Sequence, residues 1–246
     1  MDVCSWIEPD WPAPPGVRAY STTRLGGYSQ PPFDGFNLGD HVGDDQDAVA
    51  RNRVLLSSSL ELPSEPKWLT QVHGVDVIEA GITPQSWEAD AMFARNPGLV
   101  CAVLTADCLP LLLCNRSGDW VAAVHAGWRG LADGIIEATL DRLAVPENEI
   151  IAWMGPAIGP ACFEVGTKVR DSFLHHDPAT EIAFTGNGPG RWLADIYQLA
   201  KQRLRAHGVT SVWGGEYCTV TDRERFYSYR RDGRTGRMAT LVWIEK

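Results

Sequence analysis

Uninterrupted apolar runs mark the centre of the chain. Residues 99–104 and 109–113 carry almost only apolar side chains, as expected for strands that are buried on both faces. Over residues 237–244, the even-numbered and odd-numbered side chains form two alternating sets, which predicts a strand whose two faces have different surroundings. Similar patterns and flanking turn residues predict further strands at 17–22, 68–72, 75–79, 120–125, 150–154 and 209–213.

Three segments carry helical signals. Apolar residues recur at helical spacing over 131–143, and a proline follows that stripe. We expect a second helix from an N-cap at Asp47 to about Leu60, and a third over 191–207 with Gly208 as a left-handed cap. Strands and helices intermix without a regular βαβ rhythm, so the pattern favours an α+β fold over a doubly wound one.

One cysteine and two histidines lie where predicted strands end. They are His73 in T-Q-V-H-G, Cys108 in T-A-D-C-L-P and His125 in A-V-H-A-G-W-R-G. Such a set leaves the fourth position of a tetrahedral zinc open, as in catalytic sites. Alternatively, Cys108 and His125 form a nucleophile and its base. The gaps of 35 residues (73 to 108) and 17 residues (108 to 125) match no local ligand motif, so a purely structural role for all three stays open.

Charged residues near these positions suggest further roles. Asp107 interrupts the most apolar stretch, where an unpaired carboxylate is costly to bury. We expect it to orient a liganding imidazole, to move protons, or to pair with Arg129. The rigid turn at 155–160 places Glu164 near the opening, whereas His41 fits a surface loop and a site equally well. The six arginines between 223 and 237 predict a solvated face, with an anion contact as the alternative.

The charge balance argues against two classes of partner. The chain has 22 basic and 31 acidic residues, a net charge of −9. Proteins that bind nucleic acids or anionic membranes through electrostatics are usually basic. The apolar window 99–114 is too short to span a bilayer and contains Asp107 and Pro110. Without a signal peptide or a CxxC pair, we expect a cytoplasmic protein with reduced or metal-bound thiols.

Several blocks, in order, resemble the YfiH-like laccase-domain family. Its members are called polyphenol oxidase, purine nucleoside phosphorylase or peptidoglycan editing factor. The resemblance implies one α+β domain over residues 1–246, with mixed central sheets layered between helices. It also implies a single metal, usually zinc, on His73, Cys108 and His125. The blocks are F-N-L-G-D-H-V-G-D-D, T-Q-V-H-G-V-D-V, A-D-A-M, T-A-D-C-L-P, V-A-A-V-H-A-G-W-R-G, M-G-P-A-I-G-P and Y-S-Y-R-R-D-G-R-T-G-R.

The resemblance further implies phosphorolysis of adenosine, inosine and methylthioadenosine, with adenosine deamination as a side activity. The ligands would then be a small nucleoside and phosphate. The protein would be a monomer or a homodimer. A Cys–His amide hydrolase that edits peptidoglycan precursors and a metal-dependent polyphenol oxidoreductase are the alternatives. We predict Cys108, His125 and Asp107 as catalytic residues, and Asn37, Arg24, Arg51, Arg129 and Glu164 as substrate-binding residues, with the arginines as phosphate clamps.

The histidine count limits the oxidase alternative. The chain has six histidines and no H-x-H pair, too few for a multicopper cluster within one chain. A single copper ion on the His/His/Cys set remains compatible, because copper(II) outcompetes zinc at most nitrogen and sulfur sites.

Overall fold

The most apolar strands form the middle of a six-stranded mixed sheet. The computed structural model describes residues 4–246, and the strand order in this sheet is β12-β8-β6-β7-β4-β3. Every residue of β6 and β7 is buried, which explains why their sequences do not alternate. The β3–β4 and β8–β12 pairs are parallel and the others antiparallel. The strands are β3 (Val77–Glu79), β4 (Ala91–Ala94), β6 (Leu109–Asn115), β7 (Val121–Ala126), β8 (Ile150–Met154) and β12 (Ser211–Gly214).

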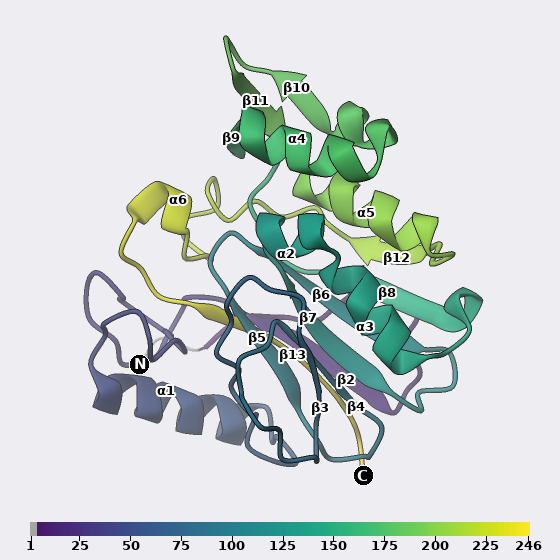
Figure 1. The fold of residues 1–246 in the computed structure, drawn as a ribbon. Helices are drawn as coiled ribbons and strands as arrows, with labels where there is room; N and C mark the ends of the chain where they lie inside the picture. Colours follow the sequence, from purple (N-terminus) through teal and green to yellow (C-terminus); the bar gives the residue numbers. More distant parts are fainter. Residues whose placement is uncertain (1–3) are drawn as a thin grey trace.

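A four-stranded antiparallel sheet packs against this one (Figure 1). Its order is β1 (Trp6–Ile7), β2 (Val17–Thr22), β13 (Met238–Ile244) and β5 (Cys101–Thr105). The core between the sheets includes Val103 and Val242 on one side and Leu112 and Val121 on the other. Strand β13 therefore alternates between this core and the opposite face of its own sheet, which explains its two sets of side chains.

Helices cover both outer faces of the paired sheets. Helix α1 (Gln46–Ser59) buries Leu56 with Trp243 on the four-stranded side. Helices α2 (Trp128–Asp133), α3 (Ile135–Leu143) and α5 (Ile196–Ala206) share the large core on the six-stranded side. The resulting order of helix, sheet, sheet and helix confirms the expected α+β fold with layered mixed sheets.

A smaller antiparallel sheet lies at the top of Figure 1 beside α4 (Thr167–His176). It contains β9 (Glu164–Gly166), β10 (Phe184–Gly186) and β11 (Arg191–Ala194). The G-N-G-P-G segment forms the predicted turn, between β10 and β11. Helix α6 (Tyr229–Asp232) and two 3-10 turns, Glu147–Glu149 and Pro178–Ala183, complete the elements.

Two helix predictions are wrong at their N-terminal ends. Asp45 rather than Asp47 caps α1, because the Asp45 carboxylate accepts the Ala48 N–H. Residues 191–194 are strand β11 and not helix, because they pair with β9 and β10, and Asp195 then caps α5. Beyond the other end of α5, Gly208 takes the left-handed conformation that was predicted.

Two further segments differ from their predicted form. The helical stripe over 131–143 is divided between α2 and α3, because Gly134 has a left-handed φ of 102°. Residues 68–72 form no strand and make only one isolated bridge, between Thr70 and Glu88.

No helix in the described part of the chain is both long and apolar enough to cross a membrane. All six cysteines are free thiols.

Candidate metal centre and substrate pocket

Three separate segments bring one thiol and two imidazoles together. The candidate ligand atoms of His73, Cys108 and His125 all lie within 4.8 Å of one another. Cys108 lies in the turn between β5 and β6, and His125 lies near the end of β7. The antiparallel register pairs His125 with Pro110, so Cys108 is only two residues from the residue opposite His125. Sheet pairing thus brings together two side chains that are distant in sequence.

The turn that carries His73 is held by a buried carboxylate rather than by a strand. Asp90 accepts the backbone N–H groups of His73 at 2.9 Å and Gly74 at 2.7 Å, and a longer one from Val72. His73 itself has a left-handed φ of 62°, a conformation that a non-glycine residue adopts only when its surroundings hold it there. The expectation that His73 ends a strand is therefore wrong, although the structure brings its imidazole to the cluster.

Asp90 also orients the second imidazole. The Nδ1–H of His125 donates to Asp90 Oδ1 at 2.7 Å, which leaves Nε2 available to a metal. Both side chains are almost fully buried. Burial raises the pKa of Asp90, but the hydrogen bond and charge of His125 outweigh it and hold that pKa below its ordinary value. Sequence reasoning missed this residue, whose only signal was its place in the A-D-A-M block.

Two of the roles expected for Asp107 are wrong, and its role in moving protons stays a prediction. Its carboxylate accepts the Thr219 hydroxyl and the Arg230 backbone N–H, both at 2.6 Å. It therefore neither orients an imidazole nor pairs with Arg129. With a φ of 91°, Asp107 shapes the turn that presents Cys108, and its carbonyl accepts the Ile158 N–H. The structure thus makes Asp107 the link between the Cys108 turn and α6.

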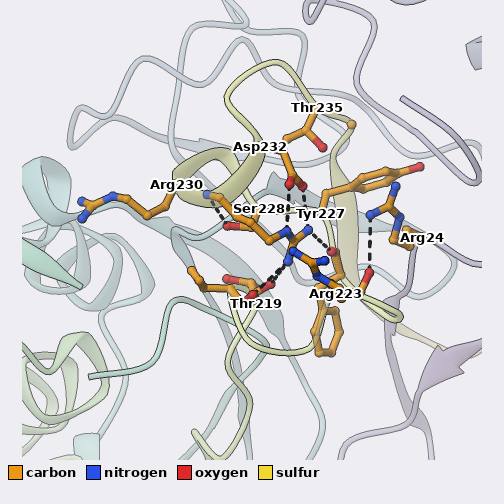
Figure 2. A network of polar contacts seen from close by, with 12 residues as sticks. Arg24, Thr219, Arg223, Tyr227, Ser228, Arg230, Asp232 and Thr235 are labelled. Carbon is orange, nitrogen blue, oxygen red and sulfur yellow. Dashed lines mark hydrogen bonds and ion pairs between the residues drawn. The ribbon is translucent and has the colours of Figure 1, made fainter. Parts of the chain in front are cut away.

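The segment around α6 is held by arginine contacts with main-chain carbonyls (Figure 2). Arg231 donates to the carbonyls of Thr219 and Phe226 and pairs with Asp232. Figure 2 shows the Arg230 side chain extending away from this network. The network therefore fixes the backbone of α6, and the Arg230 side chain lies outside it.

The surroundings of the cluster favour a deprotonated Cys108 thiol. Burial raises the pKa of Cys108, but the neighbouring His125 and His73 bring it down to about 6. Burial lowers the pKa of His125, whereas Cys108 and Asp90 together raise it to about 9. A metal ligand thiol must be deprotonated, so this environment suits a cation.

The spacing and the local backbone also suit a metal ion. Cys108 Sγ lies 3.8 Å from His73 Nε2, near the separation of about 3.5 Å that tetrahedral zinc bond lengths require. Gly127 borders the cluster, where an added Cβ would lie 2.8 Å from His73 Cδ2 and 3.1 Å from Cys108 Sγ. The glycine therefore keeps the space between the ligands free.

Gly127→Ala is expected to weaken zinc binding at least about tenfold, because the new methyl group displaces His73 and Cys108 from a shared ion. The backbone of Gly127 has φ −63° and ψ 155°, which alanine adopts without strain, so the effect comes from crowding alone. Competition with a chromophoric chelator measures the affinity. Gly166→Ala is the matched control, since Gly166 also precedes a helix and a Cβ there meets nothing within 4 Å. Equal zinc affinity of the two variants would contradict the proposed ligand set.

The cluster opens into a cavity of about 500 Å³. The residues that line it include the aromatic Trp128, Phe163 and Tyr229 and the cationic Arg230 and Arg237. His41 is also part of the lining, so its loop contributes to the site. The arginine-rich segment therefore supplies cations to the cavity, which was the alternative to a solvated face.

The three arginines predicted as phosphate clamps lie outside this cavity. Arg24 pairs with Asp34 at 2.8 Å and stacks on Tyr227. Arg51 stacks on Tyr28, and Arg129 lies against Trp128 on the exposed side of α2. Each guanidinium thus has a partner elsewhere, and the structure does not support a role for these arginines at the phosphate.

The two other predicted substrate-binding residues act on arginines of the cavity. Buried Asn37 accepts the Arg237 backbone N–H through its Oδ1 at 2.8 Å. The Glu164 carboxylate binds Arg191 and Asn187, while its carbonyl accepts Arg230 Nη1 at 2.9 Å. Neither side chain lines the cavity, so these residues position its cations instead of contacting a ligand there.

The comparison with known proteins agrees with the sequence blocks. A family model described as multi-copper polyphenol oxidoreductase laccase matches residues 18–245. The chain belongs to this family. A relative from Pseudomonas aeruginosa, named purine nucleoside phosphorylase, is 56% identical over 98% of this chain and 99% of its own length. The purine nucleoside phosphorylase YfiH of Escherichia coli is 53% identical over 97% of this chain and 98% of its own.

Solved structures of similar proteins share the fold. The Neisseria meningitidis protein NMB0706 matches with a TM-score of 0.93 and 46% identity, covering 98% of this chain and 99% of that one. YlmD from Geobacillus stearothermophilus matches with a TM-score of 0.85 and 32% identity, over 94% and 93% of the two chains. Although the family description names several coppers, the described residues gather a single His/Cys cluster.

Proposed function

We propose that this protein is a zinc-dependent purine nucleoside phosphorylase with adenosine deaminase as a side activity. The observation that carries the proposal is the His73, Cys108 and His125 cluster, which borders a cavity that also contains two guanidinium groups and three aromatic rings. Adenosine, inosine and methylthioadenosine are the proposed substrates, together with phosphate. The names of the relatives support an enzyme of this class.

Zinc is the proposed metal because three nitrogen and sulfur ligands with an open fourth position suit it. When bound, it would supply a Lewis acid beside the cavity. Copper is the alternative ion for the same donors. We further propose a cytoplasmic location, supported by the six free cysteines, and a monomer or homodimer with no nucleic-acid or membrane partner.

The residues that line the cavity suit both proposed substrates, the purine nucleoside and phosphate. The rings of Trp128, Phe163 and Tyr229 offer flat apolar surfaces against which a purine base packs. Arg230 and Arg237 offer fork-shaped cations that bind phosphate in a bidentate manner. Gly39 makes room for Arg237, since a Cβ there would lie 2.8 Å from Arg237 Cγ.

The proposed reaction is a displacement at the anomeric carbon of the ribose. A phosphate oxygen forms the new bond to C1′, and the C1′–N9 bond breaks with its electron pair leaving on the base, which takes up a proton. The products are ribose 1-phosphate and the free purine. Holding phosphate and base in one cavity makes this step effectively unimolecular. Deamination differs because water adds to C6 and ammonia leaves.

A Cys–His hydrolase is the second candidate, and one observation favours it. The Cys108 thiol has a lowered pKa next to His125, as in activated cysteine nucleophiles. Such an enzyme would cleave an amide, for example in a peptidoglycan precursor, without a metal. A bound cation and nucleophilic attack would compete for the same sulfur, so the two functions predict opposite responses to a chelator.

We expect purified protein carrying one zinc ion per chain to release base from adenosine or inosine only when phosphate is present. Chromatography of base and ribose 1-phosphate, with elemental analysis of untagged protein, measures both quantities. Chelation should abolish the activity, and zinc should restore it. Amide hydrolysis that survives chelation would establish the hydrolase instead, and full metal loading without nucleoside turnover would contradict the proposal.

A further inference from the structure

Two further cysteines, Cys162 and Cys218, lie outside the metal centre, and Cys162 directly precedes Phe163 of the cavity lining. Cys162 follows the tight turn after β8, where its N–H donates to the Gly159 carbonyl at 3.0 Å. Cys218 follows β12, and its Sγ accepts the N–H of the same glycine at 3.3 Å. The two cysteines, 56 positions apart (162 to 218), therefore contact one residue from two different segments.

The turn at Gly159 and the segment of Cys218 are in direct contact. A Cβ on Gly159 would lie 2.9 Å from Cys218 Cβ and 3.0 Å from its Sγ, so the turn packs its backbone directly against the Cys218 side chain. A second backbone hydrogen bond, from the Thr219 N–H to the Ala157 carbonyl at 3.0 Å, holds the segments together. These contacts bring the segment of Cys162, which follows Gly159 by three positions, against the Cys218 side chain.

The surroundings make the two thiols unequal. Burial raises the pKa of Cys218, but hydrogen bonds from Thr221 and from the backbone N–H of Gly159 outweigh it and lower that pKa below its ordinary value. Burial and the adjacent Cys218 both raise the pKa of Cys162. Cys218 is thus the better nucleophile, and Cys162 remains a thiol beside it. Both side chains are partly accessible, whereas Cys101 and Cys114 are fully buried.

We infer that Cys162 and Cys218 form a peroxide-sensitive dithiol that closes reversibly into a disulfide. In the first step, the Cys218 thiolate attacks hydrogen peroxide, so that an S–O bond forms, the O–O bond breaks and hydroxide leaves. In the second step, Cys162 attacks the resulting sulfenic acid, and water leaves as the S–S bond forms. Peroxide accepts the two electrons that the thiols lose, and a cellular thiol reductant reverses the change.

The position of the pair connects it to the cavity. Phe163, next to Cys162, lines the cavity, and Thr219, next to Cys218, donates its hydroxyl to Asp107. A disulfide would therefore tie the aromatic wall to the segment that holds the Cys108 turn. The inference concerns the thiols themselves and does not depend on the proposed phosphorylase activity.

The test exposes zinc-loaded, fully reduced protein to equimolar hydrogen peroxide. Mass spectrometry of non-reduced peptides should show Cys162 joined to Cys218, with a loss of two hydrogens that dithiothreitol reverses. Cys162→Ser should abolish the crosslink and leave a sulfenic acid on Cys218 that dimedone traps. Cys218→Ser should abolish both products and slow peroxide consumption about tenfold. Cys4→Ser, which removes a partly accessible cysteine elsewhere, should leave the crosslink unchanged.

Mass spectrometry of the peroxide-treated wild-type protein tests the inference without any variant. Peroxide that oxidises Cys108 with release of zinc, while Cys162 and Cys218 stay reduced, would overturn the inference. Disulfides formed only between chains would overturn it as well.

Discussion

Replacing His125 with alanine is expected to lower the rate of phosphate-dependent base release from adenosine or inosine about a thousandfold. His125 is the most buried of the three proposed ligands and the only one whose ring is fixed by a hydrogen bond to Asp90. Its loss removes a proposed metal ligand and the side chain that donates to Asp90 Oδ1. Removal of the Lewis acid raises the barrier by several kcal/mol, which gives the expected factor.

The assay compares wild-type and variant protein at equal concentration, with zinc content measured on the same samples. Phosphorolysis and deamination should respond differently to phosphate but alike to His125→Ala, because both are assigned to one metal site. His175→Ala is the matched control, since His175 is exposed on α4 and should leave the rate unchanged. A folded His125→Ala protein with wild-type phosphorolysis would show that the activity came from a contaminating enzyme.

Asp90→Asn is expected to lower zinc affinity about 10- to 100-fold and the free energy of unfolding of the metal-free protein by about 3 kcal/mol. The Asp90 carboxylate accepts hydrogen bonds from three backbone N–H groups and from the His125 ring N–H. Asp90 is fully buried. The amide of asparagine has one acceptor oxygen and turns two N–H bonds toward these donors. Chelator competition and denaturant unfolding measure the two quantities.

The same substitution should change how stability depends on pH. The folded pKa of Asp90 lies below its ordinary value of 3.8, so its stabilising contribution is present above about pH 4 and is lost as pH falls through the folded pKa. Wild-type protein should therefore lose more stability than Asp90→Asn between pH 6 and pH 3, while exposed Asp133→Asn should follow the wild type. Identical wild-type and Asp90→Asn profiles would mean that Asp90 does not hold the centre together.

The arrangement of the cavity follows from contacts between segments that are far apart. Asp107 and Thr219 are hydrogen-bonded across 112 positions, and Asn37 and Arg237 across 200. The cavity lining includes Arg230 and Arg237, and not Arg24, Arg51 or Arg129. Pairing of Asp107 with Arg129 was one of the expected roles, but the Asp107 carboxylate accepts hydrogen bonds from Thr219 and Arg230 instead.

Local sequence patterns alone predict the buried strands and the fold class. The apolar runs at 109–113 and 150–154 correspond to β6 and β8, because full burial on both faces excludes polar side chains whatever the neighbours are. The ordered blocks were sufficient for the family and for nominating His73, Cys108 and His125, since their chemistry is visible in the residue types.

Only the tertiary structure decided which groups act on one another. It showed that Asp90 holds both histidines, that β11 replaces the first turn of an expected helix, and that the turn before Cys162 packs against Cys218. Hydrophobic periodicity reports whether a side chain is buried, but not which partner it meets. Hydrogen bonds and ion pairs depend on distances of a few ångströms between segments, and these distances exist only once the sheets have paired and packed.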